Sequence, residues 1–298
     1  MNIKNIKNRA DELLVNAKPQ YVRILMIMLL IGMVQSFFSS ENGFPMIVSL
    51  MVTIAFLSFD HGYIVSSLKI VRNNYTALKD EDAWVGFSRF QALFPTYLVM
   101  GLIKFAILFC ITFVLFILLA IFYGATISYM PNLVFNTNNV ETVVQFLTTY
   151  PIFLLQILIV AFIILFVSYI LSIYFFAVAY LLEQYHMETI TAIKESIQFI
   201  HGYAFDLFKL DLSYFGWFIL IAIAEELLTY CVGFIPFFGT LIVIVLCGML
   251  SIYTFLPQYH LSRAIFFEEI AYRRYEVNHQ QTNEIVDDSV EDFNEKGE

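Results

Sequence analysis

The sequence predicts an all-α integral membrane protein with six transmembrane helices, cytoplasmic interfacial amphipathic helices and both termini in the cytoplasm. Hydrophobic residues make up 60% of the 298 residues and charged residues only 14%, against about 25% charged residues in an ordinary soluble domain. Six apolar segments are long enough to cross a hydrocarbon core of about 30 Å. Fifteen of the 16 Lys and Arg residues lie on one side of these segments, and an excess of cations marks the cytoplasmic side.

The N-terminal segment, residues 1–19, is predicted to be a cytoplasmic amphipathic helix. Between residues 2 and 17, apolar side chains recur at helical spacing, with basic residues between them; the apolar positions are Ile3, Ile6, Ala10, Leu13, Leu14 and Ala17. We expect this helix to lie on the inner membrane surface.

Residues 20–257 form the predicted six-span membrane domain. The expected spans cover about 21–38, 46–68, 96–129, 151–182, 205–230 and 237–256. A second apolar stripe at helical spacing predicts an interfacial helix at 186–202, between the fourth and fifth spans. Residues 258–278 are expected to form a third cytoplasmic amphipathic segment. The last 20 residues, 279–298, hold seven acids and one base, and we expect a disordered acidic tail.

Ionisable residues inside the spans are candidates for function, because a charge within the bilayer is costly. Asp60 and His61 lie in the second predicted span and Lys104 in the third, each about nine residues from the inner end. Both depths correspond to about 13 Å of helix, so an Asp60–Lys104 ion pair is geometrically possible. The alternative is that Lys104 extends its long side chain to the cytoplasmic interface.

Lys209 and Asp211 lie in the first two turns of the fifth predicted span. Asp206 and Lys209 form an ordinary i,i+3 pair on a helix, and acids near a helix N-terminus suit its dipole. The structural interpretation is therefore favoured here. The functional alternative is an inner polar cluster, which would comprise Asp60, His61, Lys104, Lys209 and Asp211.

Two groups of residues are candidates for close helix packing. Small side chains recur every four residues on the third predicted span, at Ala120, Gly124 and Ser128, and such faces let helices approach closely. On the fifth span, Gly216 next to Trp217 suggests the same, with stacking of a ligand on the Trp as the alternative.

The region around the fifth span resembles a known family. Residues 193–196 read IKES, residues 200–202 read IHG, and residues 207–217 read LFKLDLSYFGW. This run resembles the hallmark of the bacterial domain of unknown function 975 family, and Gly62-Tyr63 and Gly86-Phe87 match further glycine/aromatic positions of that family. The chain departs from the family pattern across 119–170, where it is longer. The resemblance implies an all-helical integral membrane protein of unsettled function and supplies no catalytic residues.

No established catalytic motif is present, and we expect no enzyme activity, cofactor or metal. Glu268 to Arg273 fits the E-E-x-x-x-R pattern of intramembrane CAAX-type proteases, but it follows the last span and only His279 lies beyond it. The three cysteines form no C-x-x-C pair and are interpreted as small apolar residues. No basic stripe suits nucleic acid.

Two classes of function are compatible with this sequence. The first is a non-catalytic accessory protein of the bacterial cell membrane, which acts through contacts with lipid or with other membrane proteins. The second is a small-solute or ion transporter that uses the inner polar cluster on spans 2, 3 and 5, although no inverted repeat is visible. A water-filled cavity reaching the cluster would favour transport, and a packed bundle with an exposed apolar groove would favour the accessory role.

Overall fold

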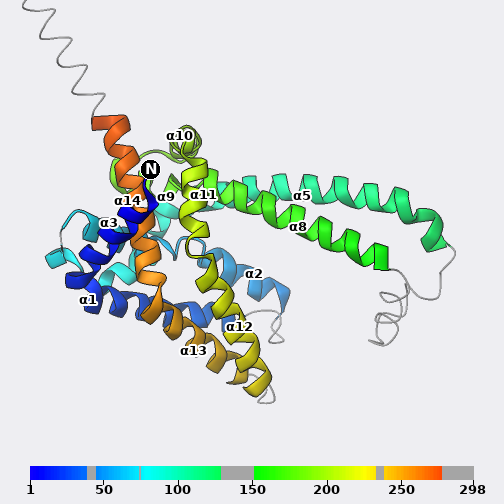
Figure 1. The fold of residues 1–298 in the computed structure, drawn as a ribbon, viewed down its shortest axis with the longest axis horizontal. Helices are drawn as coiled ribbons and strands as arrows, with labels where there is room; N and C mark the ends of the chain where they lie inside the picture. The colour runs from blue at the N-terminus through cyan, green and yellow to red at the C-terminus, as the bar shows by residue number, and fades with distance from the viewer. Residues whose placement is uncertain (39–44, 74, 129–150, 233–237, 277–298) are drawn as a thin grey trace, which may run out of the picture. The chain divides into compact units, whose positions relative to one another are not determined.

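The protein is described here by a computed structural model that covers residues 1–38, 45–73, 75–128, 151–232 and 238–276. These residues form helices joined by turns, and no strand occurs among them (Figure 1). The predicted all-α class is confirmed. The chain divides into two units: unit 1 comprises residues 1–97 and 176–298, and unit 2 comprises residues 98–175. The predicted acidic tail and the loop at 130–149 lie outside the described residues.

The central element of unit 1 is α14, Leu256–Ala271, which contacts α1, α3, α11 and α13. Its buried positions lie on several faces of the helix: Leu261, Ala264, Ile265, Phe266, Phe267, Ile270 and Ala271 are almost completely inaccessible. A helix that is apolar on most of its faces belongs in a core. Within the predicted amphipathic segment at 258–278, other helices cover the buried residues of α14 on several sides.

Helix α1, Ile3–Phe37, runs without interruption through both the predicted surface helix and the first predicted span. The Asn2 side chain caps it by accepting hydrogen bonds from the backbone N–H groups of Lys4 and Asn5. The predicted apolar stripe exists, but Ile6, Ala10 and other stripe residues are buried within unit 1, where α1 packs on α14. Helical periodicity indicates that one face of the helix is covered. We expected the membrane surface to cover this face of α1, and in the structure other helices of unit 1 cover it.

The predicted interfacial helix at 186–202 corresponds to α10, Thr189–Ile200, which follows α9, Val178–Tyr185. Phe199 of α10 and Tyr180 of α9 both stack on Phe267 of α14, with ring centroids 5.0 and 4.8 Å away. The buried face of α10 thus faces the core, whereas Ile190 is largely exposed. All three predicted amphipathic segments contribute to one helical core.

The second predicted span is not a single helix. It consists of α2, Met46–Ala55, and α3, His61–Val71, separated by turns. Two short 3₁₀ helices, η2 (Tyr75–Ala77) and η3 (Asp80–Trp84), and the one-turn helix α4 (Val85–Ser88) follow.

Two glycines allow the segment before α3 and the segment around η3 and α4 to meet at backbone distance. A Cβ atom on Gly86 would lie 2.3 Å from the Ser58 carbonyl oxygen, and one on Gly62 would lie 2.7 Å from the Asp82 carbonyl oxygen. These are the two glycine/aromatic positions that the sequence singles out.

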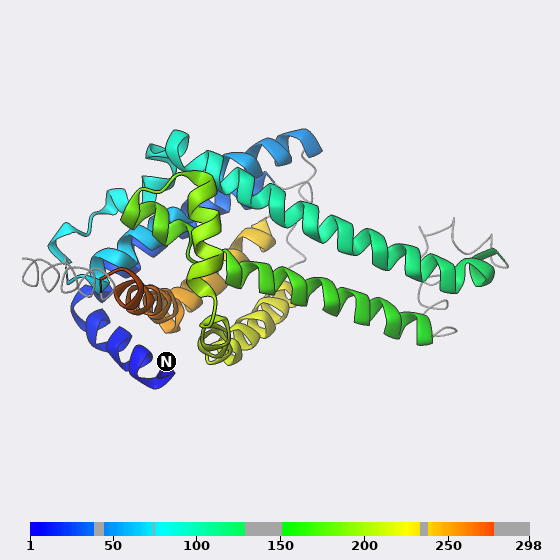
Figure 2. The same cartoon turned by 90° about the horizontal axis from the view of Figure 1, so that it is seen from above.

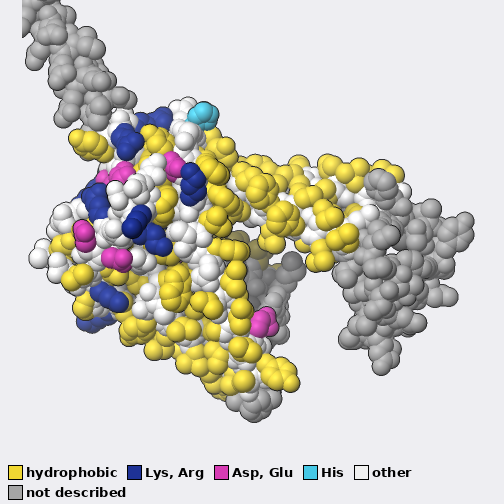
Figure 3. Space-filling model, viewed as in Figure 1, with side chains coloured by type: hydrophobic (Ala, Val, Ile, Leu, Met, Phe, Trp, Pro, Cys, Tyr) yellow, Lys and Arg dark blue, Asp and Glu magenta, His cyan; other side chains and the backbone are white. Residues whose placement is uncertain are grey.

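The fifth predicted span is divided into α11, Ala204–Leu212, and α12, Phe215–Val232. Helix α12 packs on α13, Phe238–Thr254 (Figure 1). Charged side chains gather on the part of unit 1 around α11 and α14, and hydrophobic ones cover the surface of α12 and α13 (Figure 3). This division of the surface is typical of a protein half embedded in lipid.

Unit 2 contains most of α5, Phe90–Ser128, and all of α8, Pro151–Tyr174, two long rods in Figure 2. Almost none of the residues in their apolar windows are buried. On α5, Phe105, Phe109 and Phe113 form an outward ladder with ring centroids 6.0 and 6.2 Å apart. Exposure of such surface is stable only when lipid or another protein covers it.

The described residues contain four helical segments that are long and apolar enough to cross a membrane, or five if the bent pair α13–α14 counts as one. The four are Ile3–Ser36, Phe90–Leu119, Leu155–Tyr185 and Phe215–Val232, and the pair is bent by 56°. The structure therefore supports a membrane-embedded helical protein.

Candidate functional site

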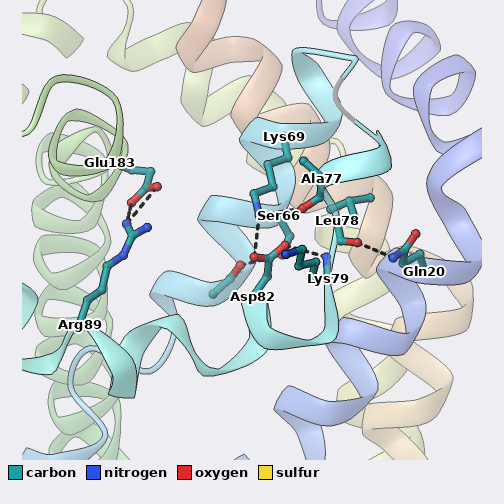
Figure 4. Close-up of polar contacts among 10 residues, drawn as sticks. Gln20, Ser66, Lys69, Ala77, Leu78, Lys79, Asp82, Arg89 and Glu183 are labelled. Atoms are coloured by element: carbon teal, nitrogen blue, oxygen red, sulfur yellow. Dashed lines mark hydrogen bonds and ion pairs between the residues drawn. The ribbon is translucent and has the colours of Figure 1, made fainter.

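His61 joins three segments of unit 1. Its Nδ1 lies 3.0 Å from the hydroxyl of Tyr97 in α5, and its Nε2 lies 3.1 Å from a carboxylate oxygen of Glu183 in α9. Arg89 donates from Nη1 to both oxygens of Glu183, at 2.9 and 3.2 Å (Figure 4). The imidazole is fully buried. Because both of its ring nitrogens are engaged, His61 acts as a structural link between helices.

Asp60, the residue next to His61, faces a cavity. It lies at the N-terminus of α3, and its side chain makes no capping hydrogen bond to that helix. The cavity has a volume of about 520 Å³ and lies within unit 1, between α1, α3, α12, α13 and α14. Most of its lining is aliphatic or aromatic, and the polar side chains among the lining residues are Gln35, Asp60, Tyr63, Ser251 and His260.

His260 and Tyr63 form one wall of this cavity. Their rings stack with centroids 4.1 Å apart. The Nδ1 atom of His260 is buried and has no hydrogen-bond partner in the described part of the chain. Buried polar atoms are almost always paired in native proteins, so this nitrogen is an exception among the described residues. No sequence pattern points to His260, because a single His after the last predicted span has no partner at a fixed spacing.

Asp211 is engaged elsewhere in unit 1. Its carboxylate lies 3.7 Å from Nε of Arg263 in α14, and the Arg263 guanidinium also lies over the rings of Phe176 and Tyr259, at 4.9 and 5.4 Å. The Asp211–Arg263 pair therefore joins α11 to the core helix. Of the three residues Asp60, His61 and Asp211, Asp60 is among those that line the cavity described above, and His61 and Asp211 are not.

Lys209 lies 3.4 Å from Asp206, which confirms the predicted i,i+3 pair. The Met1 ammonium also contacts Asp206, at 3.0 Å. The hydrogen bond that the Met1 ammonium donates to Asp206 is the largest cause of the lowered pKa of the Asp206 carboxyl. Lys209 thus belongs to an ordinary surface ion pair, which contributes little stability.

Lys104 belongs to unit 2, whereas Asp60 belongs to unit 1. Within its own unit, the Lys104 ammonium lies 5.6 Å from the centre of the Phe175 ring, within reach of a cation–π contact. The Asp60–Lys104 ion pair stays a prediction.

A further ion pair, Lys69 with Asp82, was missed by sequence reasoning. The Lys69 ammonium lies 2.6 Å from Asp82 and donates to the Ala77 carbonyl at 2.9 Å, while Asp82 accepts from the Lys79 backbone N–H (Figure 4). Gln20 donates to the Leu78 carbonyl oxygen. These contacts fix the 75–84 segment against α1 and α3. The sequence feature that could have indicated this pair is the acidic run at residues 80–82, in which Asp82 follows Lys69 by 13 positions.

The residues predicted to mediate close helix packing do not all do so in the structure. Trp217 is partly exposed and stacks on Phe255, with ring centroids 5.9 Å apart, so it packs within unit 1. Gly216 does not mediate a close approach, since a Cβ atom there would have nothing within 4 Å. Ala120, Gly124 and Ser128 lie in α5, but their side chains are outside the described residues.

The described residues hold no group of three or more His, Cys, Asp or Glu side chains that could bind a metal ion. Cys110, Cys231 and Cys247 are free thiols. Glu268, the first acid of the E-E-x-x-x-R match, pairs with Arg72 at 3.0 Å.

Comparison with known families identifies the chain. The family model described as "Protein of unknown function (DUF975)" matches residues 1–274. The chain belongs to the DUF975 family. The match includes α1 and α14 as well as the IKES to SYFGW run. Comparison with curated proteins and with solved structures gave no match. In this DUF975 member the run at 193–217 covers α10, α11 and the start of α12.

Proposed function

We propose that this protein is a non-catalytic accessory protein of the bacterial cell membrane, which acts through contacts with membrane lipid or with other membrane proteins. The proposal includes six membrane crossings and cytoplasmic termini. The observation that carries it is the use of the charged side chains. His61 and Asp211, two of the five candidates, have partners that join helices, and Lys209 lies in an ion pair on its own helix. Charged groups that are held in such contacts stabilise the fold.

The apolar surface of α12 supports the same proposal. Eight of its large hydrophobic residues are exposed, and they lie all around the helix; they are Phe215, Trp217, Phe218, Ile219, Leu220, Ile223, Leu227 and Tyr230. Lipid covers such surface in a membrane, and a second membrane protein could replace part of that lipid. Transmembrane helices associate through packing because lipid and protein surfaces are equally apolar.

Affinity purification tests the accessory role. We expect the tagged full-length protein, extracted from native membranes in mild detergent, to retain a reproducible set of membrane proteins or lipids. An unrelated multi-span protein with the same tag and expression level serves as the control. Photocrosslinking from Leu220, which is more than half exposed on α12, should then capture the same proteins or lipids. Retention no greater than that of the control would contradict the proposal.

One observation favours the transporter alternative: Asp60 lines a cavity between largely apolar helices. Reconstituted liposomes distinguish the two functions. Movement of a solute that is lost in Asp60→Asn and retained in Glu226→Gln, an exposed acid of α12 outside the cavity, would support transport. The accessory proposal predicts no movement in any of the three proteins.

The orientation is tested by labelling with a membrane-impermeant maleimide. In a background in which Cys110, Cys231 and Cys247 are replaced by Ala, we expect Asn138→Cys to react in intact cells. Thr76→Cys, an exposed position between α3 and η3, should react only after the membrane is permeabilised. The reason is that the four basic residues of this connection hold it in the cytoplasm. Labelling of Thr76→Cys from outside would reverse the orientation.

A further inference from the structure

The cavity between α1, α12, α13 and α14 combines an apolar interior with a small polar end. On α1 its lining extends from Leu25 to Gln35, ten residues or about 15 Å of helix. That length is about half of a 30 Å hydrocarbon core, which is the reach of one acyl chain within one leaflet. Ligand cavities of this kind are mostly apolar, with a few polar groups that fix orientation.

The volume of the cavity, about 520 Å³, lies within the range of about 300–1,000 Å³ that is usual for sites of small ligands. Because its apolar lining comes largely from predicted transmembrane segments, the ligand would enter from the bilayer.

The polar end is complementary to a cation with N–H donors. Asp60 supplies a carboxylate, and in the described part of unit 1 no cationic side chain forms an ion pair with it. His260 supplies the buried Nδ1 atom that has no partner among the described residues. Tyr63, stacked on His260, lines the same end. A primary ammonium has three donors and no acceptor, so it can donate to a carboxylate and to a neutral ring nitrogen at the same time.

We propose that this cavity binds one membrane lipid whose head group carries a primary ammonium, with an acyl chain along α1, α12 and α13 and the ammonium at Asp60 and His260. This inference deepens the proposed function, on which it rests, by naming the class of lipid. The cavity is thus a selective lipid site, in contrast to the nonselective contact of lipid with the outer surface of α12.

The test is native mass spectrometry of the full-length protein released from nanodiscs. The discs contain equal amounts of phosphatidylethanolamine, phosphatidylcholine and phosphatidylglycerol with identical acyl chains. We expect one retained phosphatidylethanolamine, favoured about tenfold over phosphatidylcholine, whose trimethylated head group has the same charge but no N–H donor; a charge-assisted hydrogen bond accounts for a preference of this size. Equal retention of these two lipids by the unaltered protein would overturn the inference.

Two variants with matched controls locate the site. Asp60→Asn should reduce the preference to about twofold or less, while Glu226→Gln should keep it. Gly32 lines the cavity and has open space around it, so Gly32→Phe should fill the cavity and lower retention of the bound lipid. Gly101→Phe, in the equally open surroundings of Gly101 in unit 2, should not. An unchanged preference in Asp60→Asn, or unchanged retention in Gly32→Phe, would refute the site.

The outcomes separate this inference from the proposed function. If partner proteins co-purify while no lipid preference is found, only the lipid site fails. If the lipid preference is found and the reconstituted protein also moves a solute in an Asp60-dependent manner, the site stands and the accessory function fails.

Discussion

Replacement of Phe267 with Ala is expected to lower the free energy of unfolding by about 3–5 kcal/mol, the usual cost of removing a fully buried aromatic ring. Phe267 has no accessible surface and stacks on Tyr180 and Phe199. Its loss would leave a cavity where α9, α10 and α14 meet. The measurement is thermal unfolding of the protein in mild detergent, followed by intrinsic fluorescence.

The matched control is Phe105→Ala. Phe105 is also an aromatic residue of a helix, but two thirds of its surface is exposed on α5. Its replacement should change the unfolding midpoint far less than the replacement of Phe267. Equal shifts for the two variants would show that α14 is not the centre of a packed core.

Gly86→Ala should have the second largest effect, a destabilisation of about 1–3 kcal/mol, typical of an overpacked site. The added methyl group would meet the Ser58 carbonyl oxygen and the Phe59 Cα at 2.3 and 2.7 Å. These are backbone atoms, so no side-chain rotation relieves the overlap. The two segments would have to separate, which would also strain the 2.9 Å hydrogen bond from Ser58 to the Gly86 carbonyl.

Gly101→Ala is the control for Gly86→Ala and should have the opposite sign. Gly101 lies within α5 and has nothing within 4 Å of its Cβ position. Because Ala is a better helix former than Gly, we expect a gain of about 0.5–1 kcal/mol. Heat-induced aggregation, measured by size-exclusion chromatography after heating, gives a second readout for both variants. A Gly86→Ala protein as stable as the original would contradict the close approach.

The sequence was sufficient to predict helices and where the stripes lie, because helical periodicity is a local property of the chain. Ile6 and Ala10 in α1, and Ile193 and Ile200 in α10, are buried as their spacing predicts, whereas Ile190 and Ile197 of the same stripe in α10 are exposed. What covers a stripe is a non-local property. An apolar face looks the same in the sequence whether lipid or another helix lies over it, and α14 covers the stripe of α1 here.

The candidate site likewise has features that are local in the sequence and features that are not. The cost of burying a charge pointed to Asp60, His61 and Asp211, but their surroundings depend on residues distant in sequence. Glu183 lies 122 residues from His61, and Arg263 approaches Asp211 from α14. No spacing rule connects such partners. Lys209 and Asp206, which are neighbours on one helix turn, are the pair that could be predicted.

The contact between α1 and α14 has a consequence for biogenesis. Roughly 250 residues separate the starts of the two helices, which a ribosome adds in about 12–50 s at 5–20 residues per second. Throughout that interval the apolar face of α1 lacks its final partner. Adsorption of the nascent N-terminal segment to the bilayer surface would shield it, and α14 would displace those lipids on emerging. An interfacial helix would then be a stage in the synthesis of this protein and a buried helix its finished state.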